Sequence, residues 1–164
     1  MTPADPSSTP PSSTDPSSAG PPSHELVRLE IPALPAFVGV ARVVVASVST
    51  TVDGIDDDRL EDLRLAVSEA CTNAVEAHLA DGADQRVVLR CVLEGDALEV
   101  HVEDSGTRLD AVPTVPGAEG LEDGAERGWG LQLIRALVDD VAYSATDDGG
   151  GTAVRLLVRR TTEG

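Results

Sequence analysis

The sequence predicts an α+β fold in which helices cover one face of a mostly antiparallel sheet. Segments of alternating apolar and polar residues, typical of half-buried strands, are interspersed with segments whose apolar residues recur at helical spacing. Their order along the chain is strand, two helices, two strands, a long non-periodic segment, one helix and two strands. Short glycine turns join the paired strands, as in hairpins, so neighbouring strands are expected to be antiparallel.

The N-terminal residues are not expected to belong to this domain. Residues 1–24 hold seven of the 11 prolines and, apart from Met1, no aliphatic side chain larger than alanine. Such a segment cannot bury enough apolar surface to offset the entropy lost on ordering. We therefore predict a disordered Pro/Ser-rich tail followed by one folded domain over residues 25–161.

The first part of the domain is predicted to contain one strand and two helices. Residues 26–31 alternate apolar and charged side chains, as a half-buried strand does. Pro35 suits the first turn of the first helix, because its missing N–H would be unpaired there in any residue. The second helix is predicted over residues 58–80, with Asp58 as its N-terminal cap. Its apolar residues recur at helical spacing: Leu60, Leu63, Val67, Ala70, Ala74 and Ala77.

The second part is predicted to contain two hairpins separated by a loop and a helix. Residues 86–95 and 97–106 read as strands joined by a Gly-Asp turn. Residues 107–127 lose all periodicity, and a loop of that length in a compact domain is usually functional or disordered. A helix is predicted over residues 128–141, and a closing hairpin with a glycine turn over residues 141–160.

The net charge and the lack of lysine exclude several kinds of binding and catalytic site. The formal net charge is −17, and all 12 basic residues are arginines. Direct nucleic-acid binding is disfavoured, because phosphate neutralisation needs clustered basic side chains. The absence of lysine excludes a Walker A loop, the strand lysine of eukaryotic-type protein kinases and Schiff-base chemistry.

The sequence also indicates a cytoplasmic protein. It has no signal peptide and no apolar stretch long enough to cross a bilayer, so no membrane association is expected. Cys71 and Cys91 are too few and too far apart for a zinc site or a disulfide framework. We interpret both as small buried hydrophobic residues. His24 in the tail, His78 and His101 are histidines without an expected partner and receive no role.

The second helix carries a polar pair among small apolar residues. Glu69 and Asn73 are four residues apart and share a helix face, as does Glu76 one turn on. A carboxylate and a carboxamide in this arrangement offer a proton acceptor and an oxygen ligand, which suits an activated hydroxyl and a hard ion such as Mg²⁺. A solvated polar stripe on an amphipathic helix would give the same pattern.

A second motif could form part of a nucleotide site. Asp104 and Gly106 form an Asp-x-Gly at a strand end, where a carboxylate can accept a hydrogen bond from an exocyclic amine. The glycine would let the backbone approach a flat ring closely. An ordinary turn has the same composition, so the motif is weak by itself.

The glycines near the last helix and the last strand add two more elements. Gly128 and Gly130 are predicted at the mouth of a helix, where unpaired N–H groups and the helix dipole can face an anion beside Arg127. Residues 149–151 precede Thr152, whose hydroxyl could contact phosphate. The simpler interpretations are a loop that needs glycine to turn and a plain hairpin turn.

In this order, the four motifs resemble those of the GHKL ATPases, which include gyrase B, MutL, a heat-shock chaperone and the sensor histidine kinases. Within that family, residues 63–78 (LRLAVSEACTNAVEAH) are most similar to the anti-sigma factor serine/threonine kinases of the RsbW and SpoIIAB type. The resemblance covers residues 26–160. The matches are Glu69 to Asn73 with the N box, Asp104 to Gly106 with the first glycine box, Arg127 to Leu131 with the second, and Gly151-Thr152 with the last.

The resemblance implies the Bergerat fold, a two-layer α/β sandwich that binds Mg-ATP beneath a mobile lid, here about residues 107–127. It implies that Asn73 coordinates Mg²⁺ and contacts the nucleotide, and that Glu69 is the general base for the attacking hydroxyl. Asp104 would bind the adenine amine, with Thr152 at the base edge. The remaining implied ATP contacts are Gly106 in the adenine floor and Arg127, Gly128, Gly130 and Leu131 in the triphosphate loop.

The implied function is an anti-sigma factor that also acts as an ATP-dependent protein serine/threonine kinase in transcription regulation and stress response. It would phosphorylate an anti-anti-sigma (STAS) protein and sequester a sigma factor, and a homodimer is a further expectation. The alternative is a catalytically weak module that binds ATP structurally and holds a sigma factor or another regulator. Thr107 and Arg108 in place of a second glycine, and a lysine-free acidic lid, favour that alternative. A histidine kinase half is disfavoured because residues 1–24 cannot supply a phospho-accepting helical hairpin.

Overall fold

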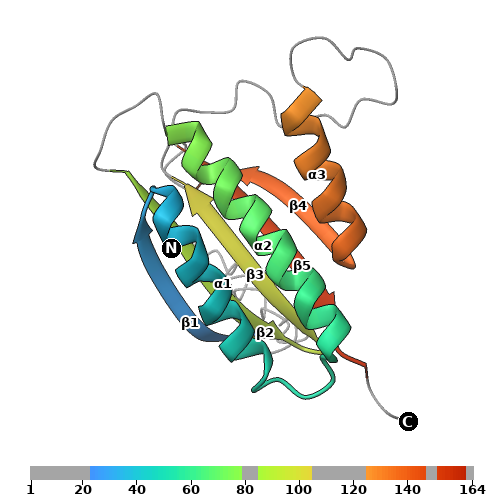
Figure 1. Cartoon of the computed structure of the whole chain (residues 1–164). Helices are drawn as coiled ribbons and strands as arrows, with labels where there is room; N and C mark the ends of the chain where they lie inside the picture. Colours follow the sequence, from blue (N-terminus) through green and yellow to red (C-terminus); the bar gives the residue numbers. More distant parts are fainter. Residues whose placement is uncertain (1–22, 79–84, 105–124, 147–150, 162–164) are drawn as a thin grey trace, which may run out of the picture.

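The structure, a computed structural model, describes residues 23–78, 85–104, 125–146 and 151–161 (Figure 1). Within these ranges no helix is both long and apolar enough to cross a membrane. The helices and strands are β1 (Ser23–Pro32), α1 (Pro35–Ser49), α2 (Asp57–His78), β2 (Arg86–Glu94), β3 (Ala97–Asp104), α3 (Ala125–Leu137), β4 (Asp140–Ala145) and β5 (Thr152–Arg159).

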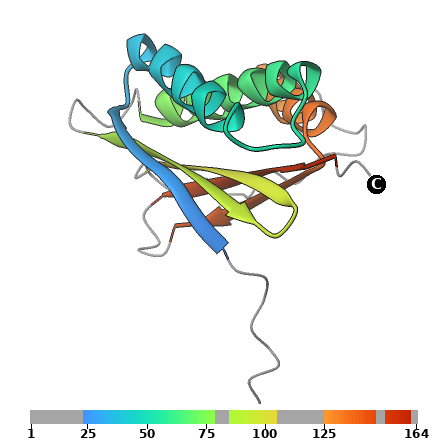
Figure 2. The same cartoon turned by 90° about the horizontal axis from the view of Figure 1, so that it is seen from below.

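The five strands form one sheet in the order β1-β2-β3-β5-β4, and every neighbouring pair is antiparallel. Figure 2 shows the three helices together on one face of this sheet, while the other face carries no described helix. The predicted α+β sandwich is therefore confirmed. The β2–β3 hairpin turns at Gly95-Asp96 as predicted, with Gly95 at a φ of 59°.

The hydrophobic core lies between the helices and the sheet. Alternate strand residues point into it, so Val87, Leu89 and Cys91 of β2 are fully buried, whereas Val88 and Arg90 between them are only half-buried. Each fully buried aliphatic side chain of this size contributes about 1.5–3 kcal/mol. Helix α2 supplies the largest helical share of the core: Leu63, Ala66, Val67, Ala70, Cys71, Ala74 and Val75.

Both cysteines are core residues, as the sequence indicated. Burial raises the pKa of Cys71 to about 12 and the pKa of Cys91 to about 12, so both thiols are uncharged at neutral pH. An uncharged thiol is a poor nucleophile and a poor metal ligand. The two residues therefore serve packing.

The N-terminus of α2 is capped by a different aspartate from the one predicted. The Arg59 N–H donates to Asp56 Oδ1 at 2.9 Å, so Asp56 is the cap and the helix begins at Asp57. Asp58 instead lies in the first turn, where its charge complements the positive end of the helix dipole. The sequence could not separate three consecutive aspartates. Pro35, by contrast, stands in the first turn of α1 as predicted.

Helix α3 is displaced from its predicted range. It begins at Ala125, inside the segment predicted to be non-periodic, and ends at Leu137 instead of residue 141. It stops early because the next residues already join the sheet. The Asp139 N–H donates to the Leu157 carbonyl at 3.0 Å, and its carboxylate accepts the Arg159 N–H at 2.7 Å.

Strand β1 is longer than predicted. It starts at Ser23, because β2 continues to Glu94 and offers a backbone partner there. His24 therefore lies in a strand, although the sequence placed it in the tail. The rest of the predicted tail lies outside the described residues.

The loop between α1 and α2 is tied to the end of β5. Gly54 has a φ of 88°, and its carbonyl accepts the Thr161 N–H at 2.7 Å. The guanidinium of Arg160 donates to the Asp53 carbonyl at 2.7 Å. A Cβ at position 54 would lie 2.7 Å from the Thr161 carbonyl oxygen, so only glycine fits this turn without displacement.

Gly54→Ala is expected to lower the free energy of unfolding by about 1–3 kcal/mol, through backbone strain and the close approach. Gly39→Ala in α1 is the matched control, because a Cβ there would meet only an arginine nitrogen at 3.9 Å. It is expected to raise the free energy of unfolding by about 0.5–1 kcal/mol. Urea denaturation measures both changes, and a Gly54→Ala protein as stable as Gly39→Ala would contradict the expectation.

Candidate functional site

The described site residues gather at one end of the sandwich. Asp104 is the last residue of β3 and Thr152 the first of β5, and these strands are antiparallel neighbours. The end of β3 therefore lies beside the start of β5. Figure 1 shows that the C-terminal end of α2 and the start of α3 lie at this same end of the sheet.

Glu69 and Asn73 lie on α2, one turn apart and half-buried. Ala70 directly follows Glu69, and Ala74 directly follows Asn73. These alanines are exposed by only 1% and 5%, so their small side chains let this part of α2 pack closely. Among the described residues, neither Glu69 nor Asn73 makes a hydrogen bond or an ion pair. Within the described part of the chain, no polar contact therefore occupies their oxygens.

The side chain of Glu69 reaches across to α3 at Gly130. A Cβ at position 130 would overlap Glu69 Oε1 and would lie 3.0 Å from its Cδ and 3.3 Å from its Cγ. Gly130 is itself buried. The structure therefore brings a residue of the predicted N box against a residue of the second glycine box.

Asp104 and Thr152 are also brought together. The Thr152 N–H donates to Asp104 Oδ1 at 3.3 Å, which joins the second and the last of the four motifs. Thr146 holds the start of β5 in place, because its hydroxyl accepts the Gly151 N–H at 2.9 Å and its own N–H donates to the Gly151 carbonyl at 3.1 Å. This pairing orients the strand that carries Thr152.

The second glycine box differs from its predicted geometry. Because α3 begins at Ala125, Gly128 lies in the first turn but Gly130 lies in the second, beyond the unpaired N–H groups of the helix start. Gly130 therefore does not lie at the mouth of the helix, where the sequence predicted it, whereas Gly128 lies in the first turn. Leu131 is half-buried on the same helix.

Some predicted site residues cannot be placed. Gly106, Gly149, Gly150 and residues 107–124 of the predicted lid lie outside the described residues. The backbone of Arg127 belongs to α3, but its side chain also lies outside the description.

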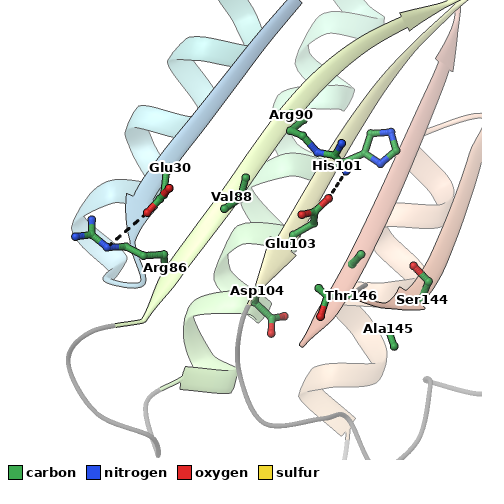
Figure 3. Close-up of a pocket in the computed structure, with 11 residues that line it drawn as sticks. Glu30, Arg86, Val88, Arg90, His101, Glu103, Asp104, Ser144, Ala145 and Thr146 are labelled. Atoms are coloured by element: carbon green, nitrogen blue, oxygen red, sulfur yellow. Dashed lines mark hydrogen bonds and ion pairs between the residues drawn. The ribbon is translucent and has the colours of Figure 1, made fainter. Parts of the chain in front are cut away.

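A pocket of about 460 Å³ lies on the face of the sheet opposite the helices (Figure 3). Asp104 lines one end of it, whereas Glu69 and Asn73 do not line it. Arg90 and Glu103 form an ion pair in its wall. Since Glu69 and Asn73 lie on the helical side, we do not assign the nucleotide to this pocket.

His101, which also lines the pocket, has a partner that the sequence did not predict. Its Nε2 lies 3.0 Å from Glu99 Oε2, and the other Glu99 oxygen accepts a bond from Arg155 at 2.9 Å. Glu99 is only 5% exposed. Because residues two apart on a strand share a face, the pattern Glu-x-His was the signal that could have found this pair. Glu99 bonds to both His101 and Arg155 within the sheet, which explains the contact, and we assign it no catalytic role.

The described residues fit a magnesium nucleotide. No group of three or more His, Cys, Asp or Glu side chains in the described ranges could hold a metal without help. Asn73 offers one oxygen, and Mg²⁺ commonly takes one or two protein ligands and completes its shell with water and substrate phosphates. A carboxylate at Asp104 can accept a hydrogen bond from an adenine amine.

Comparison with known proteins finds related sequences over most of the chain. Residues 31–158 match the family described as histidine kinase-like ATPase domain. The serine-protein kinase RsbW of Bacillus pumilus is 36% identical over 129 residues, which cover 74% of this chain and 79% of that protein. RsbW of Bacillus subtilis is 34% identical over 124 residues, covering 71% and 76%. RsbW of Listeria monocytogenes serotype 4a is 32% identical over 124 residues, covering 72% and 78%.

Asp104→Asn is expected to reduce the rise in Tm that Mg-ATP produces, because the amide presents a donor where the adenine amine needs an acceptor. A ligand at 100 times its Kd stabilises by about 2.7 kcal/mol, and a tenfold loss of affinity would remove about half of that. The Tm without nucleotide should change little, because the oxygen of the introduced amide can still accept the Thr152 N–H.

Glu103→Gln is the matched control, since this neighbouring carboxylate faces the opposite side of the sheet and pairs with Arg90. It should leave the nucleotide-dependent rise in Tm intact. If both variants lost the same part of the nucleotide-dependent rise in Tm, the loss would come from removing negative charge in general. It would then not be evidence that Asp104 recognises adenine.

Proposed function

Since the chain belongs to the histidine kinase-like ATPase family, and within it to the group of the RsbW serine-protein kinases, we propose that it is an ATP-dependent protein serine/threonine kinase and an anti-sigma factor. Its substrate is an anti-anti-sigma protein of the STAS class, and without that protein it sequesters a sigma factor. The observation that carries the proposal is the half-buried pair Glu69 and Asn73, which has no partner among the described residues.

Phosphoryl transfer asks the protein mainly to position the nucleophile and to balance charge. Glu69 accepts the proton of the substrate hydroxyl as the hydroxyl oxygen bonds to the γ-phosphorus and the bond from that phosphorus to the ADP oxygen breaks. Its half-buried position restricts water around the carboxylate. The reaction yields ADP and a phosphoserine or phosphothreonine.

Asn73 would hold Mg²⁺ through its carbonyl oxygen, and the ion would neutralise charge on the phosphates. Asp104 would accept a hydrogen bond from the adenine amine, and Thr152, whose N–H already donates to Asp104, would lie at the base edge. Arg127 and the N–H of Gly128 in the first turn of α3 are the groups proposed to meet the triphosphate. Gly106 and Leu131 complete the proposed nucleotide contacts.

We propose that the protein acts in the cytoplasm and forms a homodimer. Its net charge of −17 makes direct contact with nucleic acid unfavourable, so its effect on transcription is expected through protein partners. No described contact favours the alternative of a module that binds ATP without phosphotransfer, and the kinase assay below separates the two.

The test is transfer of phosphate from Mg-ATP to the anti-anti-sigma protein encoded by the same genome. The wild-type protein should produce phosphoserine or phosphothreonine, detected by mass spectrometry. Glu69→Gln should lower kcat by about 10²–10⁴-fold, because the amide cannot take up the proton. The Mg-ATP-dependent rise in Tm should persist in this variant.

Glu61→Gln is the control for charge on the same helix, since Glu61 is exposed and paired only with Arg64. It should transfer phosphate at the wild-type rate. Absence of phosphotransfer by the wild type, or an unchanged rate in Glu69→Gln, would sink the kinase proposal. Nucleotide binding without turnover would support the alternative.

Sigma factor binding is expected to weaken with salt, because an acidic protein meets a basic face of its partner. Exposed charges are screened over about 10 Å at 0.1 M salt, so raising the salt from about 0.05 to 0.5 M should increase Kd roughly tenfold or more. Isothermal titration calorimetry at several salt concentrations measures this slope. A Kd that stays constant would argue for an apolar interface instead.

A further inference from the structure

Gly130 lies in the interior of α3, and one contact explains why this position holds a glycine. Glycine weakens a helix interior relative to alanine, so an interior glycine calls for a physical reason. At Gly39 in α1 a Cβ would meet only an arginine nitrogen at 3.9 Å, whereas at Gly130 a Cβ would occupy the place of Glu69 Oε1. The space that the absent side chain leaves is filled by the carboxylate of Glu69.

Both backbones at this contact are held by buried neighbours. On α3, Ile134 lies one turn beyond Gly130 on the same face and is fully buried. On α2, Ala66 and Ala70 flank Glu69 and are exposed by 0% and 1%. Neither helix can shift toward or away from the other without disturbing the core.

The carboxylate of Glu69 makes no hydrogen bond or ion pair to any residue that the structure describes. Among the described contacts, its packing against Gly130 of α3 is therefore the one that limits where the carboxylate can stand.

We propose that Gly130 is a positioning residue for Glu69, so that α3 determines where the general base stands. This inference rests on the proposed function for its kinetic consequence. The same helix carries Arg127 and Gly128 in its first turn, which the proposed function assigns to the triphosphate. A single rigid helix thus relates the position of the base to the position of the phosphates.

The steric part of the proposal is tested by Tm measurements on variants at positions 69 and 130. Gly130→Ala should raise Tm less than Gly39→Ala does, because the end of the Glu69 side chain must move aside to admit the added methyl group. In a Glu69→Asp background, whose carboxylate is one methylene shorter, the same substitution should raise Tm as much as Gly39→Ala does. In a Glu69→Gln background, whose side chain keeps its length, the gain in Tm should be as small as with Glu69.

Gly39→Ala is the matched control for the helix propensity of alanine, and it should raise Tm. The proposal is overturned if Gly130→Ala raises Tm as Gly39→Ala does. It is also overturned if the effect of Gly130→Ala on Tm is the same in the Glu69→Asp background, because the contact would then not be the cause.

The kinetic part separates positioning of the base from binding of the phosphates. Below its Tm, the Gly130→Ala protein should lose kcat for phosphotransfer by about tenfold or more while its Kd for Mg-ATP changes less than about threefold. A rise in the Kd for Mg-ATP as large as the loss of kcat would assign Gly130 to nucleotide binding and overturn the proposal. If the wild type transfers no phosphate, the proposed function fails, and the Tm measurements still decide whether Gly130 accommodates Glu69.

Discussion

The close packing of α2 is the constraint on which the rest of the structure depends. Ala66, Ala70 and Ala74 recur every four residues and are exposed by 0%, 1% and 5%. These small side chains keep the helix backbone close to its neighbours, so the polar residues beside them, Glu69 and Asn73, are half-buried instead of standing in solvent. Larger residues at the alanine positions would push the helix outward and move both oxygens away from the ends of β3 and β5.

Several charged residues elsewhere in the described structure are paired with one another. On the face opposite the helices, Arg155 bridges Glu99 and Asp140, and Arg90 pairs with Glu103. The partly exposed pairs of Arg90 with Glu103 and of Arg155 with Asp140 stabilise the sheet modestly. Glu99 is buried, so its bond from Arg155 offsets the cost of desolvating its carboxylate. Glu69 and Asn73 are half-buried, and no described residue pairs with either of them. The proposed mechanism uses both side chains.

Local sequence rules identified the elements but not their limits. Periodicity predicted α2, and a Gly-Asp pair predicted the β2–β3 turn, because both features depend on residues close in the chain. The predicted C-terminal end of α3 was wrong. Asp139 forms its hydrogen bonds with β5, and no local sequence pattern contains that information. The hydrogen-bonded contact of His101 with Glu99 was missed although the two residues are only two apart.

The sequence by itself determined the α+β class, the antiparallel order of the hairpins and the candidate polar residues on α2 and β3, because spacing and turn chemistry are local properties. Only the tertiary structure decided which of these residues meet. The pairing of β3 with β5 joins Asp104 to Thr152, and the packing of α3 on α2 joins Gly130 to Glu69. Such contacts depend on where the core fixes two segments that are distant in the sequence. The identity of either residue alone does not specify how far apart the two residues lie.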